Sequence, residues 1–314
     1  MCAASLAREA GDTGAAEHYL KTADRWRNNV AGWTFTTRGS LEVPAASQNR
    51  RHYLRITAGG DPDGDGSYRD NNGSGTHAER SIIDGGFLEL VRLGAMSAAD
   101  WTVLETLPEY DSALKRTIPS KGDAWFRYNF DGYGERNDGS GYRNNVGCGR
   151  LWPIFTAERG IYEIERARDG ARGAPYRQAL RAFASPAGLI PEQVWPATTS
   201  VTGWLTQTPE GEVPGTATRS IRPLNWAMGE YINLVAAIAS GRGDAPKAVT
   251  DRYRTDQPQV TVVFVVTAST VPGQNVYLTG DSPLMGAWTP SSGVKLDART
   301  YPNWTVTISL PANA

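Results

Sequence analysis

Hydrophobic residues recur every three or four positions in several stretches of the chain, as far as about residue 242. This spacing places them along one face of an α-helix. Capping residues before the stretches and glycines after them mark where such helices begin and end. The residues before Arg8 also read as the last part of a helix. Helices are therefore predicted over residues 15–30, 78–93, 98–116, 152–167, 174–184 and 224–239.

The segments that join these helices are long. Residues 58–75 and 129–149 are rich in Gly, Asn, Asp and Tyr, and long ordered loops between helices often carry functional residues. No strand pattern alternates regularly with the helices, which disfavours a parallel α/β sheet. The sequence thus predicts a mainly α fold with its candidate site on loops.

The pattern changes after Gly241. Residues 247–258 are polar and read as a linker. Runs of strand-type residues then occupy 260–266, 275–280 and 304–310, separated by turn residues. These runs predict an antiparallel β-sandwich. Only about 55 residues are available for it, whereas such sandwiches usually have about 100, so we expect a partial sandwich that lacks its C-terminal part.

Charge and composition narrow the function. The chain has 32 Lys and Arg against 33 Asp and Glu, which disfavours a nucleic-acid-binding protein and leaves a neutral ligand open. The chain has 10 Trp and 13 Tyr against 7 Phe, and Trp and Tyr are the aromatic residues that sugar-binding surfaces require, although large cores also use them. No apolar run approaches the roughly 20 residues that cross a bilayer, so no membrane partner is expected. Cys2 and Cys148 allow a disulfide but do not establish one.

The stretch LIPEQVW at residues 189–195 places a carboxylate, an amide and an indole in a loop introduced by a proline. The indole of Trp195 offers a flat apolar face to a pyranose, the amide of Gln193 can bind its hydroxyls, and Glu192 can take a proton from water. Alone this pattern is weak, because a loop carboxylate is usually a solvated surface charge. It becomes specific only together with the surrounding motifs.

Metal binding is disfavoured. Asp61, Asp63 and Asp65 alternate before Gly66 as in a calcium-binding loop, but the twelfth position is Asn72, where such a loop has Glu. A polar turn is the better interpretation. The histidines have no metal-ligand spacing, and no pair of cysteines supports zinc. We expect neither a metal nor another cofactor.

Five motifs carry a resemblance to a known family. They read YLRI…GDPDGDGSYRDNNGSG…ERSIIDGGFLELVRLG, WFRYNFDGYGERNDGSGY, GRLWPIFTAERGIYEI, IPEQVW and RPLNWAMGEYINL. On these motifs, residues 1–243 resemble the C-terminal part of the catalytic domain of bacterial glucoamylases, glycoside hydrolase family 15. After a linker at 244–258, residues 259–314 resemble the N-terminal part of a starch-binding domain, carbohydrate-binding module family 20. The motifs there are VVFVVTASTVPGQNVYLTGDSPLMGAWTPSSGVKL and YPNW.

The resemblance implies a partial (α/α)6 barrel followed by a partial antiparallel β-sandwich. It also implies a glucan 1,4-alpha-glucosidase that releases terminal α-1,4-linked glucose from starch and maltooligosaccharides with inversion. Inversion uses two carboxyl groups about 6.5–9.5 Å apart, one a general acid and the other a general base that activates water. Glu192 matches the family's base. Secretion, and a monomer when complete, are further implications of the resemblance.

The family's general acid lies in a Trp-Glu-Glu-type loop N-terminal to the part that this chain matches, and no such loop occurs in the sequence. The predicted helices also account for only part of the barrel. We therefore expect a fragment that holds the base and lacks the acid, without a signal peptide of its own. The alternative function is a non-catalytic starch or α-glucan binder.

Further substrate contacts follow from the resemblance. Arg127 matches an arginine that hydrogen-bonds the sugar near the cleaved bond, and Trp152 matches an aromatic wall of the pocket. The alternatives are a surface ion pair for Arg127 and a core indole for Trp152. Gln193 and Trp195 complete the expected substrate-binding set beside the base. The other carboxylates in matching text are expected to be structural: Glu79, Asp131, Glu135 and Glu158.

In the C-terminal module, Trp288 matches an exposed tryptophan that stacks on starch. Tyr301 and Trp304 match aromatics near a second sugar site, although a core position on a strand is an equal alternative for Trp304. Part of the family completes this second site with a tyrosine in the loop before the second strand, and Pro272 stands there in this chain. The sequence therefore predicts starch binding at Trp288 and leaves the second site open.

Overall fold

The computed structural model describes residues 1–41, 50–70, 75–144, 146–197, 199–201 and 204–312. Their contacts divide the chain into two compact units. Met1–Trp33, Leu93–Trp101 and Ala245–Ala314 form one, here called the terminal unit. Thr34–Arg92 and Thr102–Asp244 form the other, here called the central unit. No helix of the described residues is both long enough and apolar enough to span a membrane.

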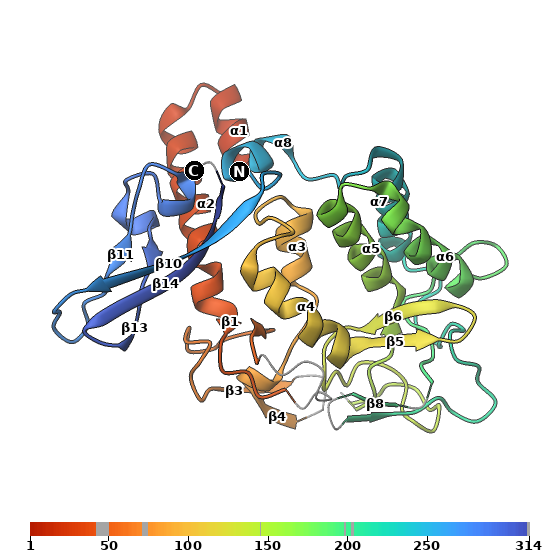
Figure 1. The fold of residues 1–314 in the computed structure, drawn as a ribbon. Helices are drawn as coiled ribbons and strands as arrows, with labels where there is room; N and C mark the ends of the chain where they lie inside the picture. Colours follow the sequence, from red (N-terminus) through yellow and green to blue (C-terminus); the bar gives the residue numbers. More distant parts are fainter. Residues whose placement is uncertain (42–49, 71–74, 145, 198, 202–203, 313–314) are drawn as a thin grey trace. The chain divides into compact units, whose positions relative to one another are not determined.

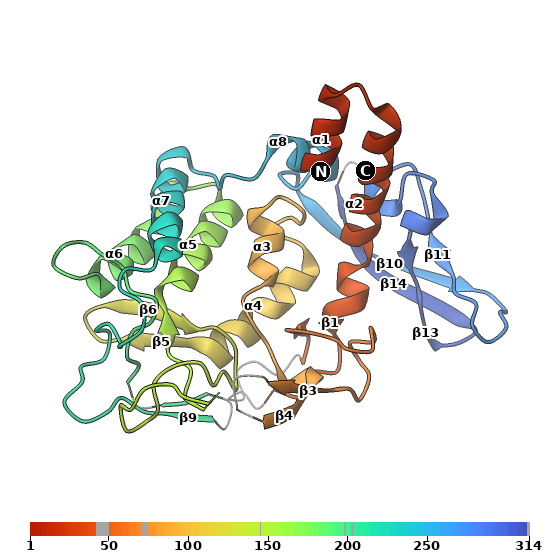
Figure 2. The same cartoon turned by 180° about the vertical axis from the view of Figure 1, so that it is seen from behind.

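Helices provide the frame of the central unit. They are α3 (Phe87–Arg92), α4 (Trp101–Leu114), α5 (Pro153–Ala167), α6 (Ala174–Phe183) and α7 (Asn225–Ser240), with a 3-10 turn, η2 (Gly170–Gly173), before α6. α5, α6 and α7 lie side by side in both views of the ribbon (Figure 1, Figure 2). Gly160 permits the close approach of α5 to α6, because a Cβ atom on it would stand 2.8 Å from the Cβ of Tyr176. Side chains such as Ile161, Leu180 and Leu234 fill the core between them.

Short antiparallel strands connect these helices. One sheet has the order β5-β6-β7, formed by β5 (Lys115–Ile118), β6 (Gly122–Phe126) and β7 (Leu151–Trp152). The described ranges also contain three strand pairs: β1 (Phe35–Thr36) with β2 (His52–Tyr53), β3 (Ser67–Asp70) with β4 (Gly75–Ala78), and β8 (Thr199–Val201) with β9 (Trp204–Thr206). The loops between them carry most of the candidate site residues.

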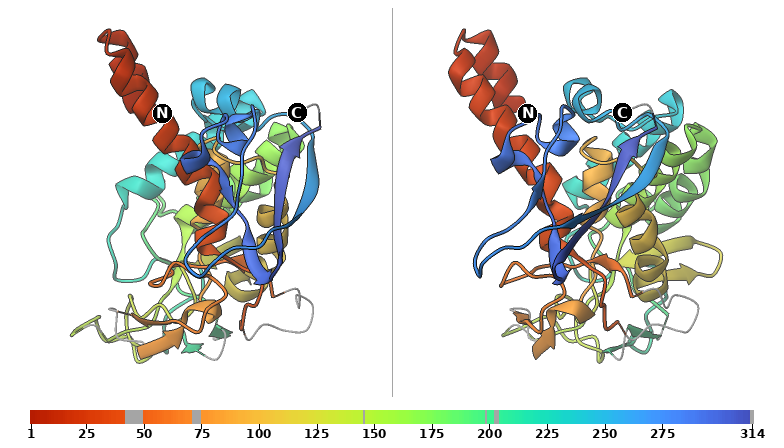
Figure 3. Two further views of the ribbon diagram at one scale, coloured as in Figure 1. Left: turned by 90° about the vertical axis from the view of Figure 1, so that its left-hand side faces the viewer. Right: turned by 60° about the vertical axis from the view of Figure 1, so that its left-hand side comes forward.

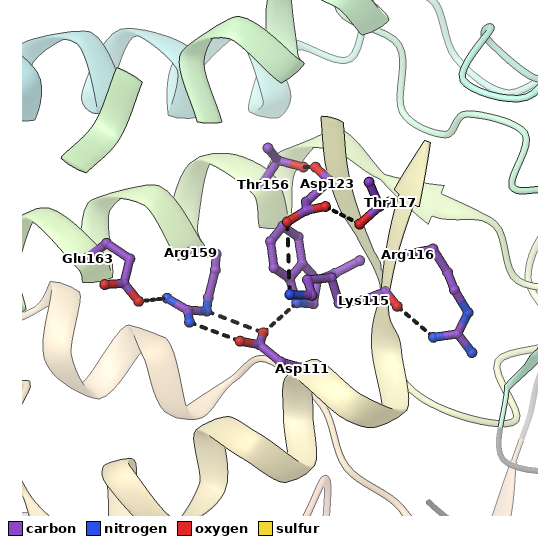
Figure 4. A network of polar contacts seen from close by, with 9 residues as sticks. Asp111, Lys115, Arg116, Thr117, Asp123, Thr156, Arg159 and Glu163 are labelled. Carbon is purple, nitrogen blue, oxygen red and sulfur yellow. Dashed lines mark hydrogen bonds and ion pairs between the residues drawn. The ribbon is translucent and has the colours of Figure 1, made fainter. Parts of the chain in front are cut away.

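A polar network fastens the β5–β6 hairpin to two helices (Figure 4). Arg159 on α5 forms an ion pair with Asp111 of α4, with 2.9 Å between Nη2 and Oδ2, and another with Glu163. The same Asp111 accepts a hydrogen bond of 2.9 Å from the indole nitrogen of Trp125 on β6. Both Arg159 and Trp125 are buried. One carboxylate thus joins α4, α5 and β6, which fixes the strand hairpin that leads into the site.

The terminal unit combines segments from both ends of the sequence. α1 (Cys2–Glu9) and α2 (Thr13–Thr34) form a hairpin, and α8 (Lys247–Tyr253) precedes the strands (Figure 3). β10 (Gln259–Thr267) pairs with β14 (Asn303–Pro311) over its whole length, and β13 (Asp297–Thr300) pairs with the other edge of β14. The remaining elements are β11 (Tyr277–Leu278), η3 (Pro283–Met285), η4 (Pro290–Ser292) and β12 (Val294–Lys295), with β11 paired to β12.

Side chains of α2 hold the segment that follows β11. Asn28 donates hydrogen bonds to the carbonyls of Pro283 and Ser292, at 2.8 and 3.0 Å, and Asn29 donates to the carbonyl of Gly293 at 3.1 Å. The apolar core of this unit likewise draws on distant segments. It contains Val249, Tyr253, Leu284 and Leu310.

Most predicted elements are confirmed. α2, α4, α5, α6 and α7 lie over predicted helical ranges, α1 lies where the end of a helix was expected, and β10, β11 and β14 lie over the predicted strand runs. The order of a helical part followed by a small antiparallel region agrees with the predicted fold class. A helix also lies inside the segment predicted as a polar linker: α8 at Lys247–Tyr253, whose Val249 and Tyr253 are buried. Those two apolar residues are four positions apart, the spacing of a helix face.

The predicted helix over residues 78–93 is wrong in its first half. Only a 3-10 turn, η1 (Glu79–Ser81), and the short helix α3 (Phe87–Arg92) form there. Between them the chain is extended: Ile83 bridges Leu54, and its backbone N–H donates to the side chain of Asn129 at 2.9 Å. Partners distant in the sequence therefore prevail over the local apolar spacing.

Candidate active site

The segment Glu192–Trp195 is an extended strip of chain held on both edges. On one edge, Leu151 of β7 and Val194 exchange backbone hydrogen bonds of 3.3 and 2.8 Å. On the other edge, Val194 bridges Ala217, and the N–H of Glu192 donates to the carbonyl of Ile221 at 2.9 Å. Main-chain bonds on both edges therefore fix the backbone from which the Glu192 side chain extends.

Glu192 is buried, with only 7% of its surface exposed. Its Oε2 atom has no hydrogen-bond partner among the residues that the structure describes. Burial raises the pKa of this carboxyl above its usual value, opposed by hydrogen bonds from the Ile221 backbone and Ser220 and by the charge of Arg127. A buried carboxylate with one unpartnered oxygen has the geometry of a group that binds a water or a ligand hydroxyl.

Arg127 is held by Asp131 through two hydrogen bonds, of 2.9 Å from Nε and 2.8 Å from Nη2. Its guanidinium carbon lies 5.2 Å from the ring centre of Trp152 and 5.4 Å from that of Tyr133. The side chain of Asp131 is 1% exposed, so this is a largely buried pair and not the alternative of a surface ion pair. Arg127 is therefore fixed beside the rings of Trp152 and Tyr133.

Trp152 lies against two aromatic rings, with centroid distances of 6.0 Å to Tyr133 and 6.2 Å to Phe155. The indole is mostly buried, and its N–H has no acceptor among the described residues. A buried donor without an acceptor costs free energy unless a ligand or water completes it. The burial of Trp152 fits the alternative of a core indole, and its unpartnered N–H fits the predicted wall of a sugar pocket.

Tyr133 is a site residue that sequence reasoning missed. Its ring contacts Trp152 and lies 5.3 Å, centroid to centroid, from that of Tyr142. Burial, and after it the charge of Glu192, raise the pKa of the Tyr133 hydroxyl. The residue stands in the Gly-rich part of the quoted motif at 125–142, which contains several aromatic residues and does not distinguish one of them. Its proximity to Glu192 comes only from the fold.

Gln193 and Trp195, which follow Glu192 in the same segment, are buried. The amide of Gln193 is fully buried and donates to the carbonyl of Tyr133 at 3.2 Å. Trp195 is 1% exposed, and the guanidinium of Arg150 lies 4.9 Å from its ring centre. The guanidinium of Arg150 thus covers one face of the buried indole, and the role of Trp195 as a sugar contact stays a prediction.

The four other motif carboxylates that were expected to be structural are buried: Glu79, Asp131, Glu135 and Glu158. Glu79 accepts from the backbone of Ala58 at 3.0 Å, and Glu135 accepts from the backbone of Arg219 at 2.6 Å. Burial raises the pKa of Glu158 well above its usual value, with Glu89 and Glu230 adding to the shift. Glu135 also differs from the others, since its charge raises the pKa of Glu192 and its Oε2 lacks a partner within the described ranges.

The acidic turn at residues 61–66 is occupied by protein contacts. Asp63 accepts hydrogen bonds from the hydroxyls of Thr36 and Thr37, at 2.7 and 2.8 Å, and Asp65 pairs with Arg80. No group of three or more His, Cys, Asp or Glu residues in the described part of the chain could hold a metal. Asn72, the twelfth position of the proposed loop, lies outside that part.

Two of the three aromatics predicted to bind starch are exposed. Trp288 is 69% exposed in a tight turn, with φ of 58° and its N–H bonded to the carbonyl of Gly280 at 2.6 Å. Tyr301 is 54% exposed. Trp304 is buried, and its indole donates to the carbonyl of Ala268 at 3.0 Å, so the alternative of a core position describes it.

Comparison with known proteins agrees with this geometry. The profile of the glycosyl hydrolases family 15 matches residues 1–235, and that of the starch binding domain matches residues 259–314. A glucoamylase of Clostridium sp. (strain G0005) is 39% identical over 253 residues, which are 80% of this chain and 32% of that protein. A crystal structure of a bacterial glucoamylase complexed with acarbose matches with a TM-score of 0.70 and 40% identity, over 80% of this chain and 34% of that one. An alpha-amylase of Streptomyces violaceus is 55% identical over 49 residues, 16% of this chain and 9% of its own length. The chain thus spans about a third of the glucoamylases that it matches.

Proposed function

Because the chain belongs to the glycosyl hydrolases family 15 and has a starch-binding domain after it, we propose that it acts on α-1,4-linked glucans, with Glu192 as general base. The observation that carries the proposal is the buried Glu192 carboxylate with one oxygen unpartnered, fixed by the backbone next to Arg127. The activity proposed is that of a glucan 1,4-alpha-glucosidase, which removes terminal glucose from starch and maltooligosaccharides with inversion.

In this mechanism the ionised Glu192 removes a proton from water as the water attacks the anomeric carbon. Arg127, oriented by Asp131, donates hydrogen bonds to hydroxyls of the sugar, and Trp152 lines the same place with its indole. The cleaved oxygen needs a protonated acid on the other side of the sugar. Burial of Glu192 favours the chemistry, because a carboxylate with fewer water contacts and a raised pKa is a stronger base.

The C-terminal module supplies attachment to the polymer. The exposed indole of Trp288 would stack on a glucose ring of starch, with Tyr301 as a further aromatic contact. The module boundaries that we propose are 1–243, 244–258 as linker, and 259–314. A polymeric substrate also supports secretion, and we propose a monomer for the complete protein.

The test joins an acid-bearing N-terminal part of a family-15 glucoamylase to this chain. Glucose release from maltotetraose is measured, and NMR identifies the anomer formed first. We expect β-glucose, and Glu192→Gln should reduce turnover by about 10²–10⁴-fold while Glu210→Gln, at an exposed carboxylate, leaves it unchanged. Initial α-glucose, or no release of glucose, contradicts the proposal. Hydrolysis of maltose by the 314-residue chain alone would mean that one of its own carboxylates is the acid, and Glu158 and Glu135 would be substituted first.

A second function is a non-catalytic binder of α-glucans. The exposed indole of Trp288 supports it, because stacking on a sugar does not require Glu192. It predicts retention of the chain on granular starch with no dependence on Glu192. The two functions are separated by the anomer measurement above, since a binder releases no glucose from either variant.

A further inference from the structure

Arg150, the residue before β7, is fully buried. Burial lowers the pKa of its guanidinium, opposed by the charges of Cys148 and Glu135. A charge in the interior is destabilising unless hydrogen bonds and neighbouring dipoles compensate it. Burying an apolar side chain there would cost less free energy than burying a guanidinium. The arginine is therefore best explained by the contacts that its geometry allows.

That geometry joins two loops. Nη1 of Arg150 donates to the carbonyl of Gln207 at 2.9 Å. Nη2 donates to the carbonyls of Glu135 and Arg136, at 2.6 and 3.0 Å. These three acceptors are main-chain atoms, so the guanidinium fixes the course of the chain at both loops. One of the loops carries Tyr133 and Glu135, the residues coupled electrostatically to Glu192.

The flat face of the same guanidinium lies over the indole of Trp195, 4.9 Å from the ring centre. Trp195 ends the segment that begins with Glu192, and the neighbour of Arg150, Leu151, bonds to Val194 in the middle of that segment. Gly134 allows this packing: with φ of 154°, a Cβ atom on it would stand 2.9 Å from Oε1 of Gln193 and 3.2 Å from Cγ of Arg150. One side chain therefore contacts the loops on both sides of the base.

We infer that Arg150 is a positioning residue for the general base: it holds the segment Glu192–Trp195 in register through Trp195 and through the carbonyls of the 135–136 loop. It touches no substrate atom in this role. The inference rests on the proposed function of Glu192. It requires a planar fork and a stacking face at once, which arginine has and lysine lacks.

The test uses Arg150→Lys in the full chain, with Arg116→Lys as matched control. Arg116 also donates to main-chain carbonyls, those of Ala113 and Lys115, and lies 5.6 Å from the ring centre of Phe126, but it stands on β5. Amide hydrogen exchange is followed at Val194 and in α5. We expect exchange at Val194 to become about tenfold faster in Arg150→Lys only, with α5 unchanged in both variants. Unchanged protection at Val194 overturns the inference.

If Arg150→Lys does not fold, Trp195→Phe gives the same comparison, because it keeps the volume largely filled and weakens the stacking contact. Protection at Val194 that survives Trp195→Phe would then overturn the inference.

Turnover supplies the second readout, in the chimera described above. A positioning role predicts that kcat falls about tenfold or more in Arg150→Lys while the Kd for acarbose changes less than about threefold. A loss of acarbose affinity equal to the loss of kcat, or no loss of kcat, overturns the role in catalysis. Failure of the proposed function is recognised separately, since Glu192→Gln would then leave turnover unchanged whatever Arg150→Lys does.

Discussion

The carboxylate of Asp131 accepts two hydrogen bonds from the guanidinium of Arg127, at 2.8 and 2.9 Å, and another from the backbone N–H of Tyr133 at 3.0 Å. This one carboxylate therefore orients both the Arg127 side chain and the backbone of Tyr133. The guanidinium of Arg127 is therefore oriented by the protein itself.

Asp131→Asn tests this relationship. The amide keeps the shape but cannot accept two charge-assisted bonds from a guanidinium, each of which contributes roughly 1.5–3 kcal/mol. We expect the free energy of unfolding to fall by an amount in this range and acarbose binding to weaken about tenfold. Calorimetry and urea unfolding measure the two effects. Asp169→Asn is the control, because the Asp169–Arg172 pair is exposed and 3.8 Å long; an equal effect there would contradict the prediction.

Glu192→Gln should be more stable than the parent at neutral pH. Burial raises the pKa of the folded carboxyl above its unfolded value, so the folded state favours the neutral form. That stability is present below the unfolded pKa and is lost as pH rises through the folded pKa. We expect the gap between the variant and the parent in urea unfolding to be larger at pH 7 than at pH 4. A gap that does not depend on pH would show that the carboxyl is not strained by burial.

His52 makes the central unit sensitive to acid. Burial lowers its pKa to about 3, from an ordinary value of 6.5 that the unfolded chain regains, opposed by a backbone hydrogen bond with Arg80. Between these values the unfolded state binds a proton that the folded state does not, so stability falls as pH decreases, by up to about 1.4 kcal/mol per pH unit. In His52→Asn the free energy of unfolding should depend less on pH, because the proton taken up by His52 on unfolding is removed. His18→Asn, at an exposed position, is the control, and an unchanged slope in His52→Asn would contradict the assignment.

Trp288→Ala should release the chain from granular starch. The substitution removes the exposed apolar ring on which a glucose unit would stack. We therefore expect retention to weaken about tenfold. Trp26→Ala is a matched control, since this indole on α2 is also exposed, at 61%. Equal retention of parent and Trp288→Ala in a pull-down would remove Trp288 from the binding site.

Elements with a regular local pattern could be predicted from the sequence. α5 and α7 lie where helical spacing indicated, because their apolar faces pack against each other in the fold as the spacing requires. The extended chain at Ile83 could not be predicted, since its bridge to Leu54 and its bond to Asn129 join residues far apart in the sequence. The same limit hid the grouping of α2 with the C-terminal strands.

The residue types of the candidate site could be predicted from the sequence, but the burial of their side chains could not. The motif around Glu192 predicts a general base there, yet nothing local indicates which face of the 192–195 segment is covered by the rest of the chain. The sequence therefore could not show that Trp195 is buried with Arg150 over one face of its ring. Tyr133 could not be selected because its loop contains several aromatic residues and only the fold shows which one approaches Glu192.

The two-edged support of the 192–195 segment also limits how this protein can diverge. An insertion or deletion of one residue within this segment would turn alternate side chains to the opposite face and move Glu192 away from Arg127. Substitutions are tolerated at such a segment more readily than changes of length. Differences in substrate range among descendants of this sequence should therefore accumulate as length variation in the loops around residues 136–147 and 207–214, with the span of the base itself unchanged.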